Sequence, residues 1–368
     1  MAKEKLNRLI KILHRTFLVV NIIFAASLLI AYLSVSINPE DFVLPAFFGL
    51  AYPYLLLINI IIAVIWAVNL RYEAFISVVV IAIGFTHFSN YIKLSKPSLD
   101  KENTFKVMSY NIRLFNYFEG NKGGDSEKRI LALARSQQPD ILCFQELFLN
   151  GDVNDKDLEI KKALGGKYYS HIKLFGRGKN KSYGIATYSK FPIVGKGEII
   201  HPGSASLSIY TDIQIGNDTF TIFNNHLQSF RLKSMETSFM EELVESYDKQ
   251  TVNEIRSVSK SLSQGFKRRA IQAQVVKNYI NRSPYPVIVI GDFNDTPVSY
   301  AYRKIRKGLN DAFVSSGYGA GFTYRGNYPP NRIDYILYGK TLVNTNFSIL
   351  RVKYSDHYPI IAWFRKPV

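Results

Sequence analysis

The segment at residues 286–295, Pro-Val-Ile-Val-Ile-Gly-Asp-Phe-Asn-Asp, joins a short apolar run to a polar turn. A run of β-branched residues between a proline and a glycine predicts a fully buried strand. That strand would place Asp292 and Asn294 in a loop at its carboxyl end. A carboxylate and an amide held rigidly there can position a nucleophile and bind an anionic group. The segment alone is equally compatible with an Asx turn that only closes a strand.

Residues after position 104 repeat this pattern of apolar runs that end in polar residues. We predict strands at residues 105–110, 139–144, 182–188, 219–224, 333–337 and 360–364, and a helix at residues 127–136. Strands outnumber helices, and several of them end at an acidic or amide side chain. This part of the chain therefore reads as a globular domain with more strand than helix.

Composition separates the chain into two parts. Its 368 residues suit two or so domains, and the first hundred are overwhelmingly apolar. Most of the net charge of +17 lies in the second part, which should attract anions such as phosphodiesters or acidic membrane surfaces. The single cysteine, Cys143, excludes a disulfide within the chain and fits a strand core better than a reactive site.

Three long uncharged runs occupy residues 16–37, 42–70 and 74–92. Each is long enough to cross a bilayer core of about 30 Å at about 1.5 Å per residue. They follow one another directly, unlike the short apolar region and cleavage site of a signal peptide. We predict a transmembrane anchor of about three helices over residues 1–93. Buried helices of a soluble protein are the alternative.

Charges around these runs set the expected orientation. The basic amino terminus and Arg71 would be cytoplasmic, and Glu40 and Asp41 would be outside, in agreement with the positive-inside rule. Everything after the third run would then lie on the non-cytoplasmic side of a membrane, which we expect to be a bacterial inner membrane. Lysines in residues 93–106 oppose this orientation, and a two-span or re-entrant arrangement would reverse it.

Two segments interrupt the pattern. Residues 94–104 show no apolar periodicity and predict a linker to a domain at residues 105–368, so we expect residues 101–368 to fold alone. About forty residues after His226 lack a strand signal, and we predict a helical insertion at about residues 229–266. Its apolar side chains, which could enter a membrane interface, are Phe230, Met235, Phe239, Met240 and Leu243.

Eight polar side chains stand mostly at or next to predicted strand ends. They are Asn111, Glu146, His226, Asp292, Asn294, Asp334, Asp356 and His357. Taken singly, each has a structural explanation, such as a strand cap, a surface turn or a structural histidine. Together they supply carboxylates for a divalent ion, a base for water, and imidazoles for developing charge. Phosphodiester hydrolysis needs these parts.

Six short motifs occur in one order along the domain. They are Ser-Tyr-Asn-Ile-Arg (109–113), Gln-Glu (145–146), Asn-His-Leu-Gln (225–228), Gly-Asp-Phe-Asn (291–294), Arg-Ile-Asp-Tyr (332–335) and Ser-Asp-His-Tyr-Pro-Ile (355–360). In order and spacing this set resembles the endonuclease/exonuclease/phosphatase superfamily. That superfamily includes deoxyribonucleases, abasic-site endonucleases, neutral sphingomyelinases and inositol polyphosphate phosphatases. The resemblance covers roughly residues 105–366 and says nothing of the first hundred.

The resemblance implies a fold and a metal site. The expected fold is α/β, a four-layered α/β sandwich of two packed, mostly antiparallel sheets flanked by helices, with the site at one edge. Glu146 would ligate Mg²⁺ or Mn²⁺, supported by Asn111 and, from the far side, Asp356. Such oxygen ligands suit a small hard cation. Arg113, which follows Asn111 as in the deoxyribonuclease-like branch, would contact phosphate. The number of metal ions is left open.

The resemblance also implies catalytic roles. Asp292 would orient or deprotonate the attacking water, and Asn294 would hold a phosphate oxygen. Asp334 would keep His357 oriented toward the scissile phosphate. His226 would donate to the phosphate or to the leaving oxygen.

The expected activity is phosphodiester hydrolysis by a membrane-anchored, Mg²⁺-dependent enzyme. The basic domain favours a nuclease-like substrate, since Lys267, Arg268 and Arg269 could follow a phosphate backbone. The close alternative is a membrane lipid headgroup, as for sphingomyelinase-like or inositol-lipid phosphoesterases. A non-enzymatic binding protein on the same fold is the alternative from another class. The phosphodiester and the bilayer are the expected partners, and no obligate protein partner is inferred.

Overall fold

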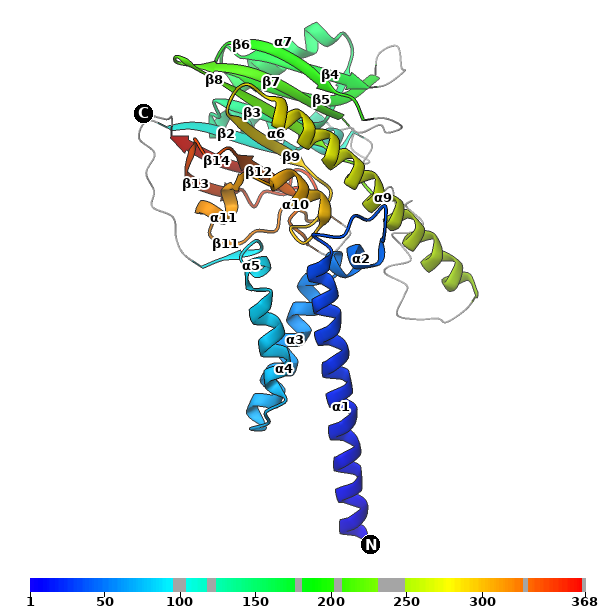
Figure 1. The fold of residues 1–368 in the computed structure, drawn as a ribbon. Coiled ribbons are helices and arrows are strands. Elements are labelled where there is room, and N and C mark those ends of the chain that lie inside the picture. The colour runs from blue at the N-terminus through cyan, green and yellow to red at the C-terminus, as the bar shows by residue number, and fades with distance from the viewer. Residues whose placement is uncertain are drawn as a thin grey trace.

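The computed structural model describes residues 1–94, 104–117, 124–175, 181–201, 207–230, 249–326 and 330–365. Its body is an α/β domain, and helices from the amino-terminal part form a stem beneath it (Figure 1). The pairing of the strands in the body determines where the polar residues of the domain meet.

Two six-stranded sheets form the body. Their strands are β2 (Thr104–Asn111), β3 (Ile141–Asn150), β4 (Tyr169–Phe175), β5 (Lys181–Ser189), β6 (Ile193–Ile199), β7 (Leu207–Ile215), β8 (Asp218–His226), β9 (Val287–Asp292), β10 (Asn310–Asp311), β12 (Asp334–Tyr338), β13 (Val343–Ile349) and β14 (Ile360–Arg365). The first sheet has the order β10-β12-β9-β8-β7-β6, and the second β13-β14-β2-β3-β5-β4. Neighbours are antiparallel, except that β8 runs parallel to β9 and β2 parallel to β3.

Apolar side chains join the layers of the domain. Ile288 and Ile290 of β9 lie in the core between the two sheets, as does Cys143 of β3. Helices pack against the outer face of each sheet (Figure 1). They are α6 (Gly124–Gln137) and α7 (Val153–Leu164) on the second sheet, and α9 (Lys249–Arg282) and α10 (Tyr300–Arg306) on the first. The prediction of two mostly antiparallel sheets flanked by helices is confirmed.

Strands that are apolar throughout lie where the sequence predicts them. Each predicted strand corresponds to β2, β3, β5, β8, β9, β12 or β14. Of the strands in the two sheets, the sequence does not predict β4, β6, β7, β10 or β13, and all of these except β7 form edges of the sheets. Side chains at the edge strand β6 alternate between half-buried and exposed, so these strands lack the continuous apolar run that marks a buried strand.

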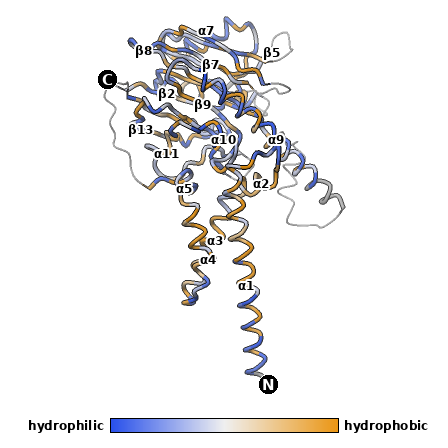
Figure 2. The backbone as a smooth tube through the Cα atoms, in the orientation of Figure 1, coloured by the Kyte–Doolittle hydropathy of each residue, from blue (hydrophilic) through white to orange (hydrophobic). Residues whose placement is uncertain are grey.

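Five helices precede the domain. They are α1 (Ala2–Leu33), α2 (Leu44–Leu50), α3 (Tyr52–Val68), α4 (Ala74–Ile83) and α5 (Phe85–Phe88). Figure 2 shows that the stem is mostly hydrophobic and that hydrophilic residues gather toward the amino-terminal end of α1. One helix, Lys3–Leu33, is long and apolar enough to cross a membrane. Helices α2 and α3 meet at a bend of 68°, and they form a second candidate span only if the two are taken together as one span.

The predicted runs at residues 42–70 and 74–92 are not single helices. Pro53 stands in the first turn of α3, where it has no N–H to donate to the preceding turn and so cannot continue α2. Gly84 ends α4, and the ring of Tyr32 fills the place where a side chain at position 84 would lie. Each of these two runs therefore holds two helices, where the sequence predicts about one helix for each run.

Buried polar groups connect the helices of the stem. The Ser77 hydroxyl of α4 donates to Asn21 Oδ1 of α1 at 2.7 Å. The Asn59 amide of α3 donates to the Phe24 carbonyl of α1 at 3.0 Å. Because apolar side chains surround these groups, their hydrogen bonds fix α1, α3 and α4 relative to one another.

The stem packs directly against the loop that follows β9. The Ser34 hydroxyl lies 2.7 Å from the Val298 carbonyl oxygen, and the Thr296 hydroxyl donates to the Gly49 carbonyl at 3.4 Å. Beyond the stem, β1 (Ile92–Lys93) pairs with β11 (Gly319–Ala320). The predicted linker lies almost wholly outside the described residues, which resume at position 104.

The predicted insertion at residues 229–266 contains the first half of a long helix. α9 begins at Lys249, within the predicted insertion, and continues past residue 266 to Arg282. Residues 231–248, which include Met235, Phe239, Met240 and Leu243, lie outside the part of the chain that the structure describes.

Candidate active site

The two parallel strand pairs bring the predicted polar residues to one edge of the sandwich. Parallel neighbours end at the same edge, so Asn111 of β2 is paired with Gln145 of β3. For the same reason His226 of β8 is paired with Asp292 of β9. The antiparallel β12 begins at this edge, which places Asp334 opposite Asp292. Acidic, amide and imidazole groups from both sheets therefore meet here.

Asn111 connects the two sheets at this edge. Its amide nitrogen donates to Asp292 Oδ2 at 3.0 Å and to Glu146 Oε1 at 3.2 Å. Its amide oxygen accepts from the backbone N–H of Arg113 at 3.0 Å. The Ser355 hydroxyl donates to the Asn111 carbonyl at 2.9 Å. The buried Asn111 side chain is thus held from both sides.

A bulge in β3 turns Glu146 into the site. The register between β3 and β5 shifts between Phe144 and Leu147, and Glu146 has a left-handed backbone with a φ of 51°. A bulge re-aims a side chain out of the regular alternation of a strand. A non-glycine residue keeps this conformation only where its surroundings hold it. The Asn111 amide and His226 are the neighbours that contact the carboxylate.

Asp292 is the buried centre of the group. Its side chain is 1% exposed and accepts from the Asn294 backbone at 2.8 Å and from the Asn294 amide at 3.2 Å. Asn294 also has a left-handed backbone, with a φ of 51°. Burial raises the pKa of Asp292 to about 6, with His357 opposing the shift and Asp334 adding to it.

Two histidines flank this carboxylate. His226 Nε2 lies 3.9 Å and His357 Nε2 lies 3.7 Å from Asp292 Oδ2. The other ring nitrogen of His357, Nδ1, is 2.9 Å from Asp334 Oδ2. Burial alone would lower the pKa of His357, but the carboxylates of Asp334 and Asp292 raise that pKa well above its usual value. The two carboxylates therefore favour the protonated form of the ring.

His226 and Glu146 form a second close pair of opposite charge. His226 Nε2 lies 3.3 Å from Glu146 Oε1. Burial opposes both charges, yet each partner stabilises the other: the pKa of His226 is raised and that of Glu146 is held at about 2. Within the described part of the chain, His226 Nε2 has no well-aligned hydrogen-bond acceptor. The pair is therefore held by opposite charge more than by a well-aligned hydrogen bond.

Asp356 and Arg113 lie next to each other beyond the end of β2. Asp356 Oδ2 is 3.4 Å from Arg113 Nε. Arg113 begins a run of left-handed residues that ends at Asn116, and each such residue costs about 1–2 kcal/mol relative to a right-handed one. The Asn116 amide donates to the Tyr354 carbonyl at 2.8 Å, which ties this turn to the segment that carries Asp356.

The donor groups at this edge fit a hard divalent cation. Carboxylates gather here: one oxygen each of Asp292 and Asp334 lies within 4.8 Å of the other and of a ring nitrogen of His357, and Glu146 supplies a further ionised carboxylate. Oxygen-rich sets of this kind suit Mg²⁺ or Mn²⁺. Asn111 directs its amide nitrogen at Glu146, so its predicted role as an oxygen ligand requires the amide to be turned over.

Two buried side chains, Gln145 and Asn224, support the site from within, and the sequence indicates no role for either. Gln145 donates to Asn224 Oδ1 at 2.7 Å across the two sheets, and both side chains are fully buried. Asn224 is the last residue of the predicted strand at 219–224 and directly follows Ile222 and Phe223. A polar residue in a buried strand signals a fixed hydrogen bond, but its partner is not readable from the sequence.

Arg269 is a structural residue. Its side chain is fully buried, its Nε donates to Asp295 Oδ2 at 2.9 Å, and it stacks on the ring of Phe230. The prediction that Arg269 follows a phosphate backbone is therefore wrong. Lys267 and Arg268 on the same helix are exposed.

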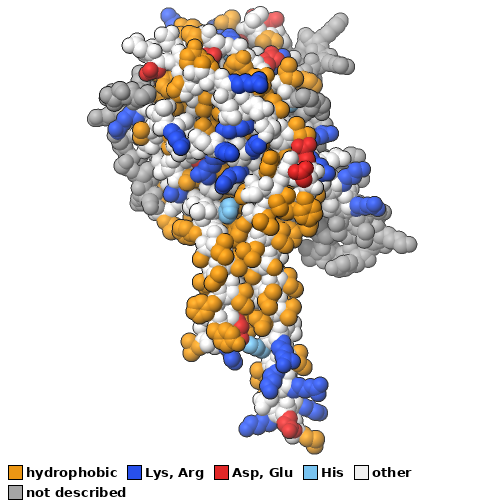
Figure 3. Space-filling model, viewed as in Figure 1, with side chains coloured by type: hydrophobic (Ala, Val, Ile, Leu, Met, Phe, Trp, Pro, Cys, Tyr) orange, Lys and Arg blue, Asp and Glu red, His pale blue; other side chains and the backbone are white. Residues whose placement is uncertain are grey.

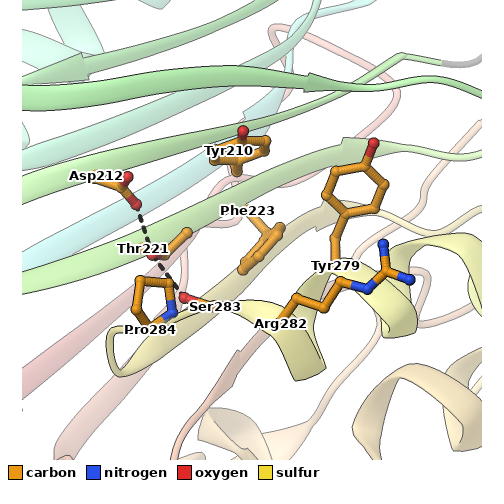
Figure 4. A pocket seen from close by; sticks show the side chains of 8 residues that line it. All are labelled: Tyr210, Asp212, Thr221, Phe223, Tyr279, Arg282, Ser283 and Pro284. Carbon is orange, nitrogen blue, oxygen red and sulfur yellow. Dashed lines mark hydrogen bonds between the residues drawn. The ribbon is translucent and has the colours of Figure 1, made fainter.

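A separate cavity of about 250 Å³ lies between the first sheet and the end of α9 (Figure 4). Tyr210, Phe223 and Tyr279 contribute its aromatic walls. The Thr221 hydroxyl donates to Asp212 Oδ1 at 2.6 Å, as the dashed line in the figure shows. None of the predicted site residues lines this cavity, and we assign it no role.

Comparison with known families identifies both parts of the chain. A model described as the Endonuclease/Exonuclease/phosphatase family matches residues 108–357, which include every predicted site residue. A second model, described as a domain of unknown function, matches residues 14–91, the stem. No curated protein matches the chain.

Solved structures share the fold of the domain. An endonuclease/exonuclease/phosphatase from Bacteroides vulgatus has a TM-score of 0.53 at 16% identity, over 72% of this chain and 99% of its own. A humanized TDP2 from D. rerio has a TM-score of 0.52 at 15% identity, over 72% of this chain and 100% of its own. A mannosyl-6-phosphatase from Bacteroides thetaiotaomicron has a TM-score of 0.50 at 20% identity, over 71% of this chain and 99% of its own.

At these identities the solved structures establish the fold, while the family match rests on the sequence itself. That match covers more than half of the chain and includes both imidazoles and all the carboxylates described above. The chain therefore belongs to the endonuclease/exonuclease/phosphatase family, whose members are metal-dependent phosphodiesterases and phosphatases.

Proposed function

We propose that the chain is a membrane-anchored, Mg²⁺-dependent phosphodiesterase. The observation that carries the proposal is the convergence of His226 and His357 on one oxygen of Asp292. A buried carboxylate between two imidazoles suits the attack of water on phosphorus, with a base on one side and proton donors on the other.

Asp292 would act on the water. With a pKa of about 6 it is ionised at neutral pH, yet basic enough to accept a proton as the water oxygen bonds to phosphorus. Hydrogen bonds from the backbone N–H and the side-chain amide of Asn294 hold the carboxylate in one orientation. Asn294 would in addition hold a phosphate oxygen next to that carboxylate.

The two imidazoles would balance the charge that develops on the phosphate. His357, fixed by Asp334, would donate from Nε2 to a phosphoryl oxygen. His226 would give its proton to the leaving oxygen as the bond from that oxygen to phosphorus breaks. One proton thus moves from water to Asp292 and one from His226 to the leaving group, which yields a phosphate monoester and an alcohol.

Glu146 and Asp356 would hold the Mg²⁺ ion, with Asn111 as a further ligand once its amide is turned. Bound there, the ion would neutralise phosphate charge and polarise the phosphoryl oxygens. Mn²⁺ would serve in its place. Arg113, 3.4 Å from Asp356, would contact the phosphate.

We infer that α1, α3 and the α4–α5 pair cross a bilayer together. They lie side by side in the stem, and buried hydrogen bonds join them. The part of α1 from Arg15 to Leu33 extends about 27 Å at about 1.5 Å per residue, close to the bilayer core of about 30 Å. His14 and Glu73, paired at 2.9 Å, would mark one boundary. The basic amino terminus beyond it would face the cytoplasm, which places the domain outside a bacterial inner membrane.

The positive charge of the domain and its contact with the stem favour different substrates. The basic domain, with Lys267 and Arg268 exposed on α9, favours a nucleic acid and hence an endonuclease-like activity. The contact of Ser34 with Val298 favours a lipid headgroup as the second candidate, because it ties the loop after Asn294 to the end of α1.

Parallel assays of the full-length protein in detergent test the proposal. Mg²⁺-dependent hydrolysis is measured on plasmid DNA and on sphingomyelin or inositol lipids in vesicles, with Glu146→Ala as the blank. Nicking that is absent in the blank identifies a nuclease, and headgroup release without nicking identifies a lipid phosphodiesterase. If the folded protein hydrolyses neither these nor a simple diester such as bis(4-nitrophenyl) phosphate, the proposal is wrong and a binding protein is favoured.

A further inference from the structure

A basic cavity of about 540 Å³ lies where the stem meets the domain. Its stem side includes Val35, His87 and Ser89, and its domain side includes Arg303 and Lys307. Figure 3 shows Lys and Arg side chains gathered on this face of the domain, immediately above the apolar stem. None of the residues of the candidate active site lines the cavity, so it is a separate site.

The domain side of the cavity carries unbalanced positive charge. Its basic side chains at and just after the end of α10 are Arg303, Arg306 and Lys307. Within the described part of the chain, none of the three forms an ion pair with a carboxylate. The carboxylate of Asp311 is bound to Arg332 at 2.5 Å.

Neighbouring residues fix this charge in place. Arg306 Nη1 donates to Asn90 Oδ1 at 2.8 Å and to the Tyr302 hydroxyl at 2.7 Å, which links α10 to the segment after α5. The Lys277 ammonium group of α9 donates to the Lys307 carbonyl oxygen. Burial, with Lys307 and Lys304 nearby, lowers the pKa of Lys277, as expected where positive charges crowd without a counter-ion. Arg303 and Lys307 themselves are exposed.

We propose that this cavity binds the phosphate group of an anionic phospholipid. Lysine and arginine at the surface of a bilayer attract such headgroups, and arginine forms strong charge-assisted bonds to phosphate. The bilayer is the favoured source because Val35, His87 and Ser89 stand where the apolar stem ends. The acyl chains can follow the stem while the headgroup reaches Arg303 and Lys307. The inference rests on the membrane location of the stem that is part of the proposed function.

Lipid competition on the full-length protein in neutral detergent tests this site. Native mass spectrometry compares retention of phosphatidylglycerol and phosphatidylcholine with identical acyl chains. The test variant is R303Q/K307Q, and the matched control is K267Q/R268Q, which removes the same charge from exposed positions on α9. We expect wild type and control to prefer phosphatidylglycerol. The test variant should bind that lipid about thirtyfold more weakly, or about 2 kcal/mol.

The remaining outcomes overturn the inference in different ways. Equal weakening in both double variants, or no preference in wild type, would mean that the cavity does not select the lipid. Displacement of phosphatidylglycerol by an equal concentration of inorganic phosphate would assign the cavity to a soluble anion. Binding of a short DNA duplex that R303Q/K307Q abolishes, without lipid preference, would assign it to nucleic acid.

Hydrolysis measured on the same samples separates this inference from the proposed function. Wild-type protein that hydrolyses a diester, with Glu146→Ala as the blank, but lacks lipid preference contradicts the inference alone. A lipid-selective protein without hydrolytic activity contradicts the proposed function alone.

Discussion

His357 and Glu146 contact Asp292 and His226, respectively, and removing either side chain should affect chemistry more than folding. We expect His357→Ala and Glu146→Ala each to lower turnover by about 10²–10⁴-fold, the usual contribution of a proton donor or a metal ligand. Turnover of bis(4-nitrophenyl) phosphate and thermal unfolding are measured together. His201→Ala is the control, since this buried histidine is bonded to Ser208 outside the site at 2.9 Å. Normal turnover in either site variant would remove the role proposed for it.

The pair of His226 and Glu146 should stabilise the metal-free protein within a limited pH window. The pKa of Glu146 falls from 4.5 to about 2 on folding, so its contribution is complete above pH 4.5 and is lost as pH falls through about 2. The pKa of His226 is raised from 6.5, so its contribution is complete below pH 6.5 and is lost as pH rises through the higher folded value. The pair therefore contributes most between pH 4.5 and 6.5.

Unfolding by urea in the presence of a chelator measures this window. The difference in unfolding free energy between wild type and His226→Gln should be largest between those pH values and should shrink toward pH 9. Asp292 and His357 titrate in both proteins, so their contributions largely cancel. A difference that does not change with pH would contradict the charge pair.

Sequence alone predicts which residues meet at the site but not how they are oriented. Strand ends place Asn111, His226 and Asp292 at one edge, because parallel neighbours end together. The left-handed backbone of Glu146 and the amide orientation of Asn111 depend on contacts made only after folding. The hydrogen bond between Gln145 and Asn224 also depends on contacts made only after folding.

At the scale of single elements, β9 can approach β8 closely only because position 291 lacks a side chain. Gly291 has a φ of 130°, and a Cβ there would overlap the carbonyl oxygen of Asn225. We expect Gly291→Ala to lower the unfolding free energy by about 1–3 kcal/mol through backbone strain and to displace the adjacent Asp292, with loss of turnover.

Gly216→Ala is the control for this substitution. Gly216 has a φ of 65°, but a Cβ there would meet no atom within 4 Å, so its cost is that of a left-handed alanine alone, about 1 kcal/mol. Urea unfolding and turnover are compared for both variants. If Gly291→Ala and Gly216→Ala had equal effects on unfolding free energy and on turnover, the approach of β8 to β9 would not be what positions Asp292.

The sequence predicts best those elements whose residues are all buried or all exposed along their whole length. β9 and β12 are buried throughout, and their apolar runs mark them. β6 and β13 are half-exposed. α9 continues to Arg282, beyond the end of the insertion predicted at residue 266. Pro53 and Gly84 mark the breaks in the stem, but hydropathy over a long window averages across them.

At the scale of the whole molecule, the segment after α5 belongs structurally to the domain. The Asn90 carbonyl accepts from Arg332 Nη1 at 2.9 Å, and the Tyr91 carbonyl accepts from the Gly321 N–H at 2.8 Å. Arg332 is fully buried, and a buried donor left without its partner costs about 1–3 kcal/mol. A fragment at residues 89–368 should therefore exceed one at 104–368 in unfolding free energy by about that amount.

Urea unfolding of both fragments in the same detergent checks this difference. R332Q introduced into both fragments should remove most of the difference between them, because the bond from Arg332 to Asp311 is lost in both and only the bond to Asn90 differs. Equal midpoints for the two fragments would support the simpler boundary predicted at the polar linker.

The sequence predicts least well how the stem is placed against the domain. Hydropathy predicts apolar helices before the domain, yet nothing in the sequence shows that Ser34 and Gly49 would touch the loop after Asn294. Contacts between residues more than two hundred positions apart follow from the packed fold, and here they join two parts that matched separate family models.

The contact between Ser34 and Val298 also bears on how the enzyme would meet its substrate. With the stem in a bilayer, the catalytic edge keeps one height and one tilt above the lipid surface, and the protein can turn only about the membrane normal. Encounters with a substrate in the same membrane would then be a search in two dimensions. Their frequency would follow the number of substrate molecules per unit of membrane area, so diluting them with inert lipid would slow the reaction even at constant bulk concentration.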